Sequence, residues 1–212
     1  MHLLALPLLL SAAAYAIKVP TAPGPHPVAV KHFELVDSDR LDIFAPLPNS
    51  KRKFMSSVYL PLKTGQTCKP QTVPYMPKLT AQVYGKQGEA LGIPQGTLEK
   101  FEMDVCDLSS IPVDMGANAQ KESYPIAIFS PGYGGSRLIY GAMARSLASL
   151  GHIVFTLDHT WEATVVEFPD GSVDYSTDLG LGNENTTLQQ LEVRSNQASS
   201  KCCNEPPTDK YP

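Results

Sequence analysis

The sequence has no apolar run long enough to cross a membrane. Its longest, MHLLALPLLLSAAAYA at residues 1–16, is shorter than the roughly 20 residues that span a bilayer. It ends in Ala14-Tyr15-Ala16, the small-x-small pattern that precedes signal-peptidase cleavage. We therefore expect residues 1–16 to be a signal peptide, removed from a secreted, extracellular protein without a transmembrane segment.

The chain also lacks an excess of positive charge and the spacings of a metal site. Its 17 Lys and Arg stand against 21 Asp and Glu, a formal net charge of −4 that argues against a nucleic-acid partner. No C-x-x-C or H-x-x-x-H spacing occurs, so we expect no zinc. Asp37, Asp39 and Asp42 lack the glycine and distal glutamate of a calcium loop, which favours a solvated turn.

Cysteine is scarce, with four residues at Cys68, Cys106, Cys202 and Cys203. In a secreted chain they suggest disulfides, for which three pairings exist. Adjacent cysteines rarely bond each other, so we favour Cys68 with Cys106 and leave the other two in the tail. The only sequon, Asn185-Thr186-Thr187, lies in a polar stretch and predicts N-glycosylation at Asn185.

The first half of the chain predicts short antiparallel strands after an extended lead-in at residues 17–31. Residues 32–36 and 41–44 flank an Asp-Ser-Asp-Arg turn, and residues 54–60 form a third candidate strand. Prolines and glycines break every long pattern from 61 to 118, and only residues 79–84 and 98–105 are long enough to hold one element each.

The pattern sharpens in the second half. Residues 126–129 (IAIF) and 153–157 (IVFTL) predict two strands, the first buried on both faces. Between them, Ser136 is a suitable N-cap and Gly151 a suitable C-cap for a helix over residues 137–150. Its apolar residues recur on one face, at Ile139, Met143, Leu147 and Leu150. A strand, helix and strand in this order predict a right-handed βαβ unit and an α/β fold.

After a glycine-rich loop, residues 188–193 could open another helix. Residues 195–212 show no apolar period and predict an irregular tail. We therefore expect one partial domain, residues 32–194.

The stretch FSPGYGGSR, residues 129–137, places three glycines directly after the first strand of this unit. A phosphate-binding loop is excluded because the lysine that it requires is missing. A dinucleotide-binding turn is a minor alternative, with Gly132 and Gly134 as its first glycines and Asp158 as the ribose-binding acid, but Arg137 occupies the third glycine position. A third alternative is that the glycines merely permit a tight turn.

The interpretation we favour is an oxyanion hole. Ester hydrolysis passes through a tetrahedral intermediate whose oxygen becomes an anion, and fixed backbone N–H groups at a strand-to-helix turn can stabilise that charge. In α/β-hydrolases the loop after an early strand supplies one such donor. Tyr133, between Gly132 and Gly134, is in the position to provide it.

A resemblance supports this interpretation. The segment YPIAIFSPGYGGSRLIYGAMARSLASLGHIVFTLDH, residues 124–159, resembles the secreted platelet-activating-factor acetylhydrolases, the 1-alkyl-2-acetylglycerophosphocholine esterases. KFMSSVYLP resembles the preceding strand of that family, and LGIPQGTLEKFEMDVC is more loosely similar to fungal-type members. Polyester-degrading cutinase relatives also carry FSPGY, so Pro131, where the family has histidine, points to a broader group of esterases.

The resemblance implies the N-terminal half of an α/β-hydrolase sheet and a lipid esterase that removes a short sn-2 acyl group by serine chemistry, without a cofactor. It implies that Tyr133 donates its backbone N–H to the oxyanion, and that Asp158 and His159 are structural. The substrate expected is a small-molecule or phospholipid ester.

The nucleophile of that chemistry is missing. An α/β-hydrolase carries it in G-x-S-x-G after the βαβ unit, and this motif occurs nowhere in the sequence. Ser130 and Ser136 are poor substitutes, the second being explained as a helix cap. We therefore expect a truncated, inactive form of a secreted esterase. The alternative is a non-catalytic secreted binding or interaction protein that retains half of the fold.

Overall fold

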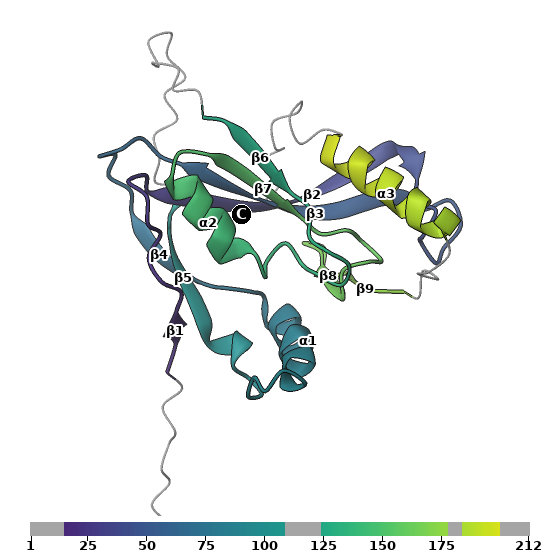
Figure 1. Ribbon diagram of the computed structural model, residues 1–212, viewed down its shortest axis with the longest axis horizontal. Coiled ribbons are helices and arrows are strands. Elements are labelled where there is room, and N and C mark those ends of the chain that lie inside the picture. Colours follow the sequence, from purple (N-terminus) through teal and green to yellow (C-terminus); the bar gives the residue numbers. More distant parts are fainter. Residues whose placement is uncertain (1–14, 109–123, 178–183, 200–212) are drawn as a thin grey trace, which may run out of the picture.

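A computed structural model of the chain describes residues 15–108, 124–177 and 184–199. Most of its strands form one mixed sheet in the order β1-β5-β2-β3-β7-β6, with β4 paired beside β5, and β8 and β9 form a separate hairpin. Figure 1 shows α2 against the middle of the sheet and α1 well apart from it, while α3 and β1 lie at opposite ends of the view. The described elements are β1 (Ile17–Lys18), β2 (Val28–Leu41), β3 (Lys51–Pro61), β4 (Pro70–Pro74), α1 (Lys78–Glu89), the 3₁₀ helix η1 (Leu98–Lys100), β5 (Phe101–Cys106), β6 (Ile126–Phe129), α2 (Gly141–Ser149), β7 (Ile153–Leu157), β8 (Val165–Glu167), β9 (Val173–Tyr175) and α3 (Glu184–Ser199).

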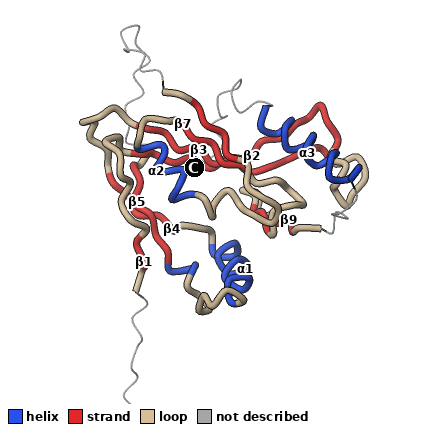
Figure 2. The backbone as a smooth tube through the Cα atoms, viewed as in Figure 1, coloured by secondary structure: helices blue, strands red, loops and turns tan. Residues whose placement is uncertain are grey.

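The long antiparallel pair β2 and β3 forms the centre of the sheet (Figure 2). The expected antiparallel pairing is confirmed, but the expected turn at residues 37–40 is wrong, because β2 continues through it with a register shift between Asp37 and Leu41. The Asp37 side chain accepts a hydrogen bond from the Asp39 N–H at 3.1 Å. This local turn forms a β-bulge within the strand, and Asp37 still pairs with Arg52 of β3. The chain reverses only after Leu41.

Part of the expected lead-in joins the sheet. β1 pairs in parallel with β5, and β2 begins at Val28, inside the stretch expected to be lead-in. Between them the chain passes the end of α2, where the Gly24 N–H donates to Ser149 Oγ at 2.9 Å and the His26 N–H donates to the Ser149 carbonyl at 3.1 Å.

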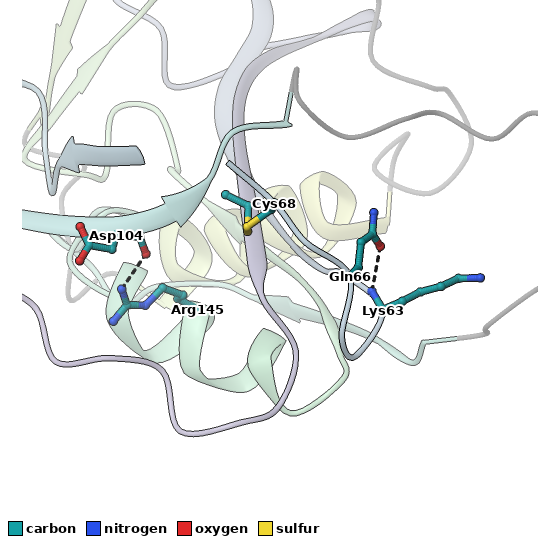
Figure 3. The surroundings of a disulfide bond; sticks show 6 residues. Lys63, Gln66, Cys68, Asp104 and Arg145 are labelled. Atoms are coloured by element: carbon teal, nitrogen blue, oxygen red, sulfur yellow. Dashed lines mark hydrogen bonds between the residues drawn. A yellow bond between two sulfur atoms is a disulfide. The ribbon is translucent and has the colours of Figure 1, made fainter. Parts of the chain in front are cut away.

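The segment from residue 62 to 106 contributes β4 and β5 to the sheet, with α1 and η1 between them. The two stretches expected to hold one element each, residues 79–84 and 98–105, correspond to α1 and to the pair η1 and β5. The expected disulfide Cys68–Cys106 is present, with a Cα–Cα distance of 5.6 Å (Figure 3). Near it Arg145 of α2 donates to the Asp104 carbonyl at 3.0 Å, which ties the helix to β5.

The predicted βαβ unit is confirmed, since β6 and β7 pair in parallel and α2 connects them. The helix is shorter than expected, because residues 137–140 form turns. Ser136 is therefore not the N-cap of α2: its Oγ accepts the Leu138 N–H at 3.2 Å within the preceding turn, and Tyr140 holds the cap position. Gly151 follows the helix with φ +92°, as a helix-ending glycine does.

The burial expected for this unit is partly wrong. α2 packs on the sheet through small residues, with Ala144 and Ala148 fully buried against a core that includes Tyr59 and Val154. The predicted apolar stripe is divided: Leu147 is half-buried and packs against this core, whereas Ile139, Met143 and Leu150 are exposed. β6 is not buried on both faces, because it is the last strand of the sheet and Ile126 and Ile128 are exposed.

Helix α3 extends past the expected end of the domain. It continues through residues 195–199, which the sequence pattern assigned to an irregular tail, and it buries Gln190, Val193 and Gln197. Residues 1–14 of the expected signal peptide, and Cys202 and Cys203, lie outside the described residues. Within the described ranges, no helix is both long and apolar enough for a membrane span.

Candidate oxyanion-binding turn

The glycine turn lies at one edge of the sheet, where chemistry is expected in an α/β fold. β6 ends at Phe129, the turn follows, and α2 starts at Gly141. β7, parallel to β6, ends close by at Leu157. The turn therefore lies at the carboxyl ends of two adjacent parallel strands, the edge at which α/β sheets bind ligands.

Gly134 fixes the turn. Its φ of +76° lies in the left-handed region that favours glycine. Its N–H donates to the Glu162 carbonyl at 3.1 Å, and its carbonyl accepts hydrogen bonds from Tyr84 Oη at 2.8 Å and Thr164 Oγ1 at 3.0 Å. Gly135 also lies in a tight space, since a Cβ there would lie 3.0 Å from the Gly132 carbonyl oxygen. Two side chains and a backbone bridge thus hold the turn rigid.

The amides at the tip of the turn are free. Within the described ranges, neither the Gly132 nor the Tyr133 N–H donates to any group of the chain, whereas the next two amides are both bonded internally. A Cβ at Gly132 would meet nothing within 4 Å, so the space beside it is open. Tyr133 is exposed, and its Oη donates to the Thr177 carbonyl at 3.3 Å. The tip can therefore offer N–H donors to an external anion.

Three side chains form a hydrogen-bonded chain beside this tip. Ser130 Oγ lies 2.6 Å from His159 Nε2, and His159 Nδ1 lies 2.5 Å from Gln197 Oε1. An amide oxygen only accepts, so His159 Nδ1 carries the proton and Nε2 accepts from the serine hydroxyl. His159 and Gln197 are buried, and Ser130 is exposed.

The charge state of His159 follows from its surroundings. Burial lowers the pKa of His159 to about 4, against an ordinary 6.5; the Gln197 hydrogen bond and Asp158 act in the opposite direction, and the positive charge of Arg194 adds to the lowering. The imidazole is therefore neutral at pH 7 and can accept a proton.

Helix α3 also holds the backbone of the turn. Arg194 donates through Nη1 to the Pro131 carbonyl at 2.9 Å and through Nε to Glu162 Oε2 at 2.8 Å, with a second contact from Nη2. Glu162 in turn accepts the Gly134 N–H at its own carbonyl. One residue of α3 therefore connects both sides of the turn.

Asp158 faces away from His159, as expected for neighbouring residues of an extended chain. Its carboxylate accepts the Arg137 N–H at 2.6 Å and also contacts the Arg137 guanidinium, and Arg137 Nε donates to Ser57 Oγ at 3.0 Å. Asp158 is fully buried. A carboxylate occupied in this way cannot bind a ribose, which argues against a dinucleotide site.

The contacts of Ser130, Gln197 and Arg194 could not be found from the sequence. Ser130 and His159 lie 29 residues apart, Arg194 follows the helix expected at residues 188–193, and Gln197 belongs to the tail without an apolar period. The one signal available was the position of Ser130 and His159 at the ends of two strands predicted to be parallel neighbours.

A hollow of about 710 Å³ lies on the sheet face that carries α2. Its lining includes Met55, Met103, Tyr75 and Arg137, the last residue of the 129–137 stretch, but none of residues 130–135. The hollow therefore adjoins the end of the turn and does not reach its tip.

Two further site expectations concern residues away from the turn. The backbone of Asn185 lies in the first turn of α3, while its side chain lies outside the described part. Among the described residues no three His, Cys, Asp or Glu side chains cluster as metal ligands would.

Comparison with known proteins places the chain among esterases. It is 27% identical over 179 residues to a protein of Arthroderma benhamiae described as a probable 1-alkyl-2-acetylglycerophosphocholine esterase, an alignment that covers 83% of this chain and 46% of that protein. The structure superposes on a ferulic acid esterase from Streptomyces cinnamoneus with a TM-score of 0.63 and 22% identity, over 88% of this chain and 51% of that one.

These comparisons identify the fold, the family and the part of the relatives that this chain covers. The structural similarity assigns the sheet to the α/β-hydrolase fold. The chain spans about half the length of the relatives that it matches. The model of the family described as platelet-activating factor acetylhydrolase, isoform II, matches residues 14–196, most of the sequence. The chain therefore belongs to the platelet-activating factor acetylhydrolase isoform II family of esterases.

Proposed function

We propose that this chain carries the oxyanion-binding half of a secreted esterase that releases a short acyl group from the sn-2 position of a phospholipid. The observation that carries the proposal is the Tyr133 N–H, which has no acceptor in the described residues and lies at the carboxyl ends of β6 and β7. A fixed donor of this kind is typically worth about 3 to 4 kcal/mol of transition-state stabilisation. The probable phospholipid esterase to which the chain is similar suggests the substrate class.

The 212-residue polypeptide alone should not turn over. It contains no G-x-S-x-G, and an oxyanion hole without its nucleophile retains only a small part of catalysis. The measurement is steady-state hydrolysis of 1-alkyl-2-acetylglycerophosphocholine by the purified polypeptide. Sustained turnover that a serine-directed inhibitor abolishes would contradict the proposed truncation. If the polypeptide binds phospholipid, and no longer form that supplies a carboxyl-terminal half hydrolyses it, a non-catalytic binding protein is favoured.

The role of Tyr133 is tested in a form that contains a nucleophile. We would join residues 17–196 to the carboxyl-terminal half of the Arthroderma benhamiae relative and compare two variants. Tyr133→Pro removes the N–H and should lower kcat by roughly 10²- to 10³-fold, whereas Tyr133→Ala keeps the N–H and should change it far less. Equal losses in both variants would exclude the backbone donor.

Secretion is part of the same proposal. The expected cleavage after Ala16 would leave Ile17 as the first residue, and β1 begins at Ile17. The Cys68–Cys106 disulfide suits an oxidising compartment. Expression in a secreting host should release a product into the culture medium whose first residue is Ile17. A product that stays inside the cell and keeps Met1 would contradict the proposed secretion.

A further inference from the structure

The hydroxyl of Ser130, an exposed residue, is bonded to a buried histidine, and the proposed function gives this contact no role. Ser130 Oγ lies 2.6 Å from His159 Nε2, within the range at which a base takes a proton from a nucleophile. Ser130 is exposed at the end of β6, so an ester could reach it. The two free amides, of Gly132 and Tyr133, follow Ser130 after Pro131 in the same turn.

The histidine is oriented as a base must be. Gln197 Oε1 holds the proton on Nδ1, which leaves the lone pair of Nε2 directed at Ser130. An amide can serve as the third member of such an arrangement, as in the Cys-His-Asn constellation of papain-like proteases. Nucleophile, base and orienting group are thus present in order, from β6, the end of β7 and α3.

We propose that Ser130 is an acyl-accepting nucleophile, which attacks small activated esters of short carboxylic acids with His159 as its base. In the acylation step Ser130 Oγ forms a bond to the ester carbonyl carbon and the bond from that carbon to the leaving oxygen breaks. The proton of the hydroxyl passes to His159 Nε2 and then to the departing oxygen. The products are an alcohol and an acyl ester on Ser130, with no oxidant or metal required.

The setting of His159 predicts how acylation depends on pH. The charged and titratable groups that act on the imidazole are Arg194 from α3 and Asp158 beside it in the chain, and burial outweighs both. His159 stays neutral down to a pH near its pKa of about 4. Acylation should therefore persist at pH 5, where an ordinary histidine with a pKa of 6.5 is mostly protonated.

The experiment uses the purified polypeptide and p-nitrophenyl acetate. We expect a burst of about one equivalent of p-nitrophenol per chain, one acetyl group in the intact mass, and its location on Ser130 by peptide mass spectrometry. Ser130→Ala should lose the burst and the acetyl group. Ser50→Ala, which changes a serine remote from His159, should keep both.

A pair of substitutions separates a relay from simple structural support. Gln197→Glu places a carboxylate against Nδ1, so the acylation rate should rise roughly tenfold and its low-pH midpoint should move upward. Gln197→Leu removes the orienting group and should slow acylation roughly tenfold or more. Circular dichroism checks that each variant is folded.

Three results would overturn the proposal: no acetylation of the folded parent, acetylation that persists in Ser130→Ala, or identical rates and pH profiles in both Gln197 variants. None of them bears on the Tyr133 donor, which is tested by turnover in the extended form.

Discussion

Individual residues in this chain are constrained by the space and charge around them, and Gly24 shows it best. A Cβ at Gly24 would lie 2.0 Å from the Ser149 carbonyl oxygen, which is backbone and cannot rotate away. Gly24→Ala should therefore destabilise the fold by about 1 to 3 kcal/mol through overpacking. The matched control is Gly85→Ala in α1, where a Cβ would meet nothing and where alanine should stabilise by about 1 kcal/mol. Urea unfolding of both variants checks the opposite signs, and a neutral Gly24→Ala would contradict the close approach.

A buried histidine makes stability depend on pH. Burial lowers the pKa of His159 to about 4, against an ordinary 6.5. His159 is neutral in the folded and the unfolded chain well above pH 6.5, so its contribution is then complete. As the pH falls from 6.5 towards 4, the unfolded chain binds protons that the folded chain refuses, and stability is lost.

The loss between pH 7.5 and 5 should be about 2 kcal/mol from His159. Urea midpoints at both pH values measure it. His159→Gln cannot titrate, and this variant should lose most of the pH-dependent change, whereas His32→Gln, at an exposed position of β2, should keep it. A parent whose midpoint is unchanged at pH 5 would show that His159 is accessible to protons in the folded state.

At the scale of elements, α3 is held mainly by polar contacts. The residues it buries include Gln190 and Gln197, and Arg194 pairs with the buried Glu162. Arg194→Met leaves the Glu162 carboxylate buried without its cation, which should cost about 3 to 5 kcal/mol. Adding Glu162→Gln removes the orphaned charge and should recover a large part of that loss. Unfolding of the two single variants and the double variant gives the coupling energy, and simple additivity would mean that the pair does not support α3.

The βαβ unit shows what sequence pattern could predict. IAIF and IVFTL around a helical stretch specified the parallel pair β6 and β7, because element type follows from the period of the apolar residues. The period does not say which helix face is inward. α2 approaches the sheet through Ala144 and Ala148, whose small side chains allow close packing, with Leu147 packed beside them. Met143 and Leu150 stay outside. The inward face was therefore set by which side chains fit closely against the sheet, and only part of the apolar stripe did.

The candidate site, like the βαβ unit, was predicted from the sequence only in part. The position of Tyr133 between glycines followed from local sequence, since a tight turn is a local property. The chain from Ser130 through His159 to Gln197 joins three elements and depends on where α3 packs, which no local pattern contains. Likewise the bulge at Asp37 replaced an expected turn because the partner strand β3 continued alongside it.

For the whole molecule, the open edge of the sheet is the dominant feature. β6 pairs only with β7 in the described sheet, and Ile126 and Ile128 on it are 54% and 39% exposed. Met143 on α2 and Leu150 just after it add further exposed apolar surface in the same βαβ unit. An unpaired strand with apolar side chains is a template for pairing with another chain. The 212-residue polypeptide should therefore associate as its concentration rises.

Sedimentation velocity over a range of concentrations measures this association. Ile128→Lys places a charge on the β6 edge and should shift the polypeptide towards monomer, because a buried lysine opposes edge-to-edge pairing. Leu91→Lys is the matched control, since Leu91 is 84% exposed after α1 and away from the edge, and it should associate as the parent does. If the parent is monomeric and unfolds cooperatively at high concentration, the edge of β6 is protected and the exposed isoleucines do not drive assembly. If both lysine variants dissociate equally, general charge repulsion and not the strand edge controls the association.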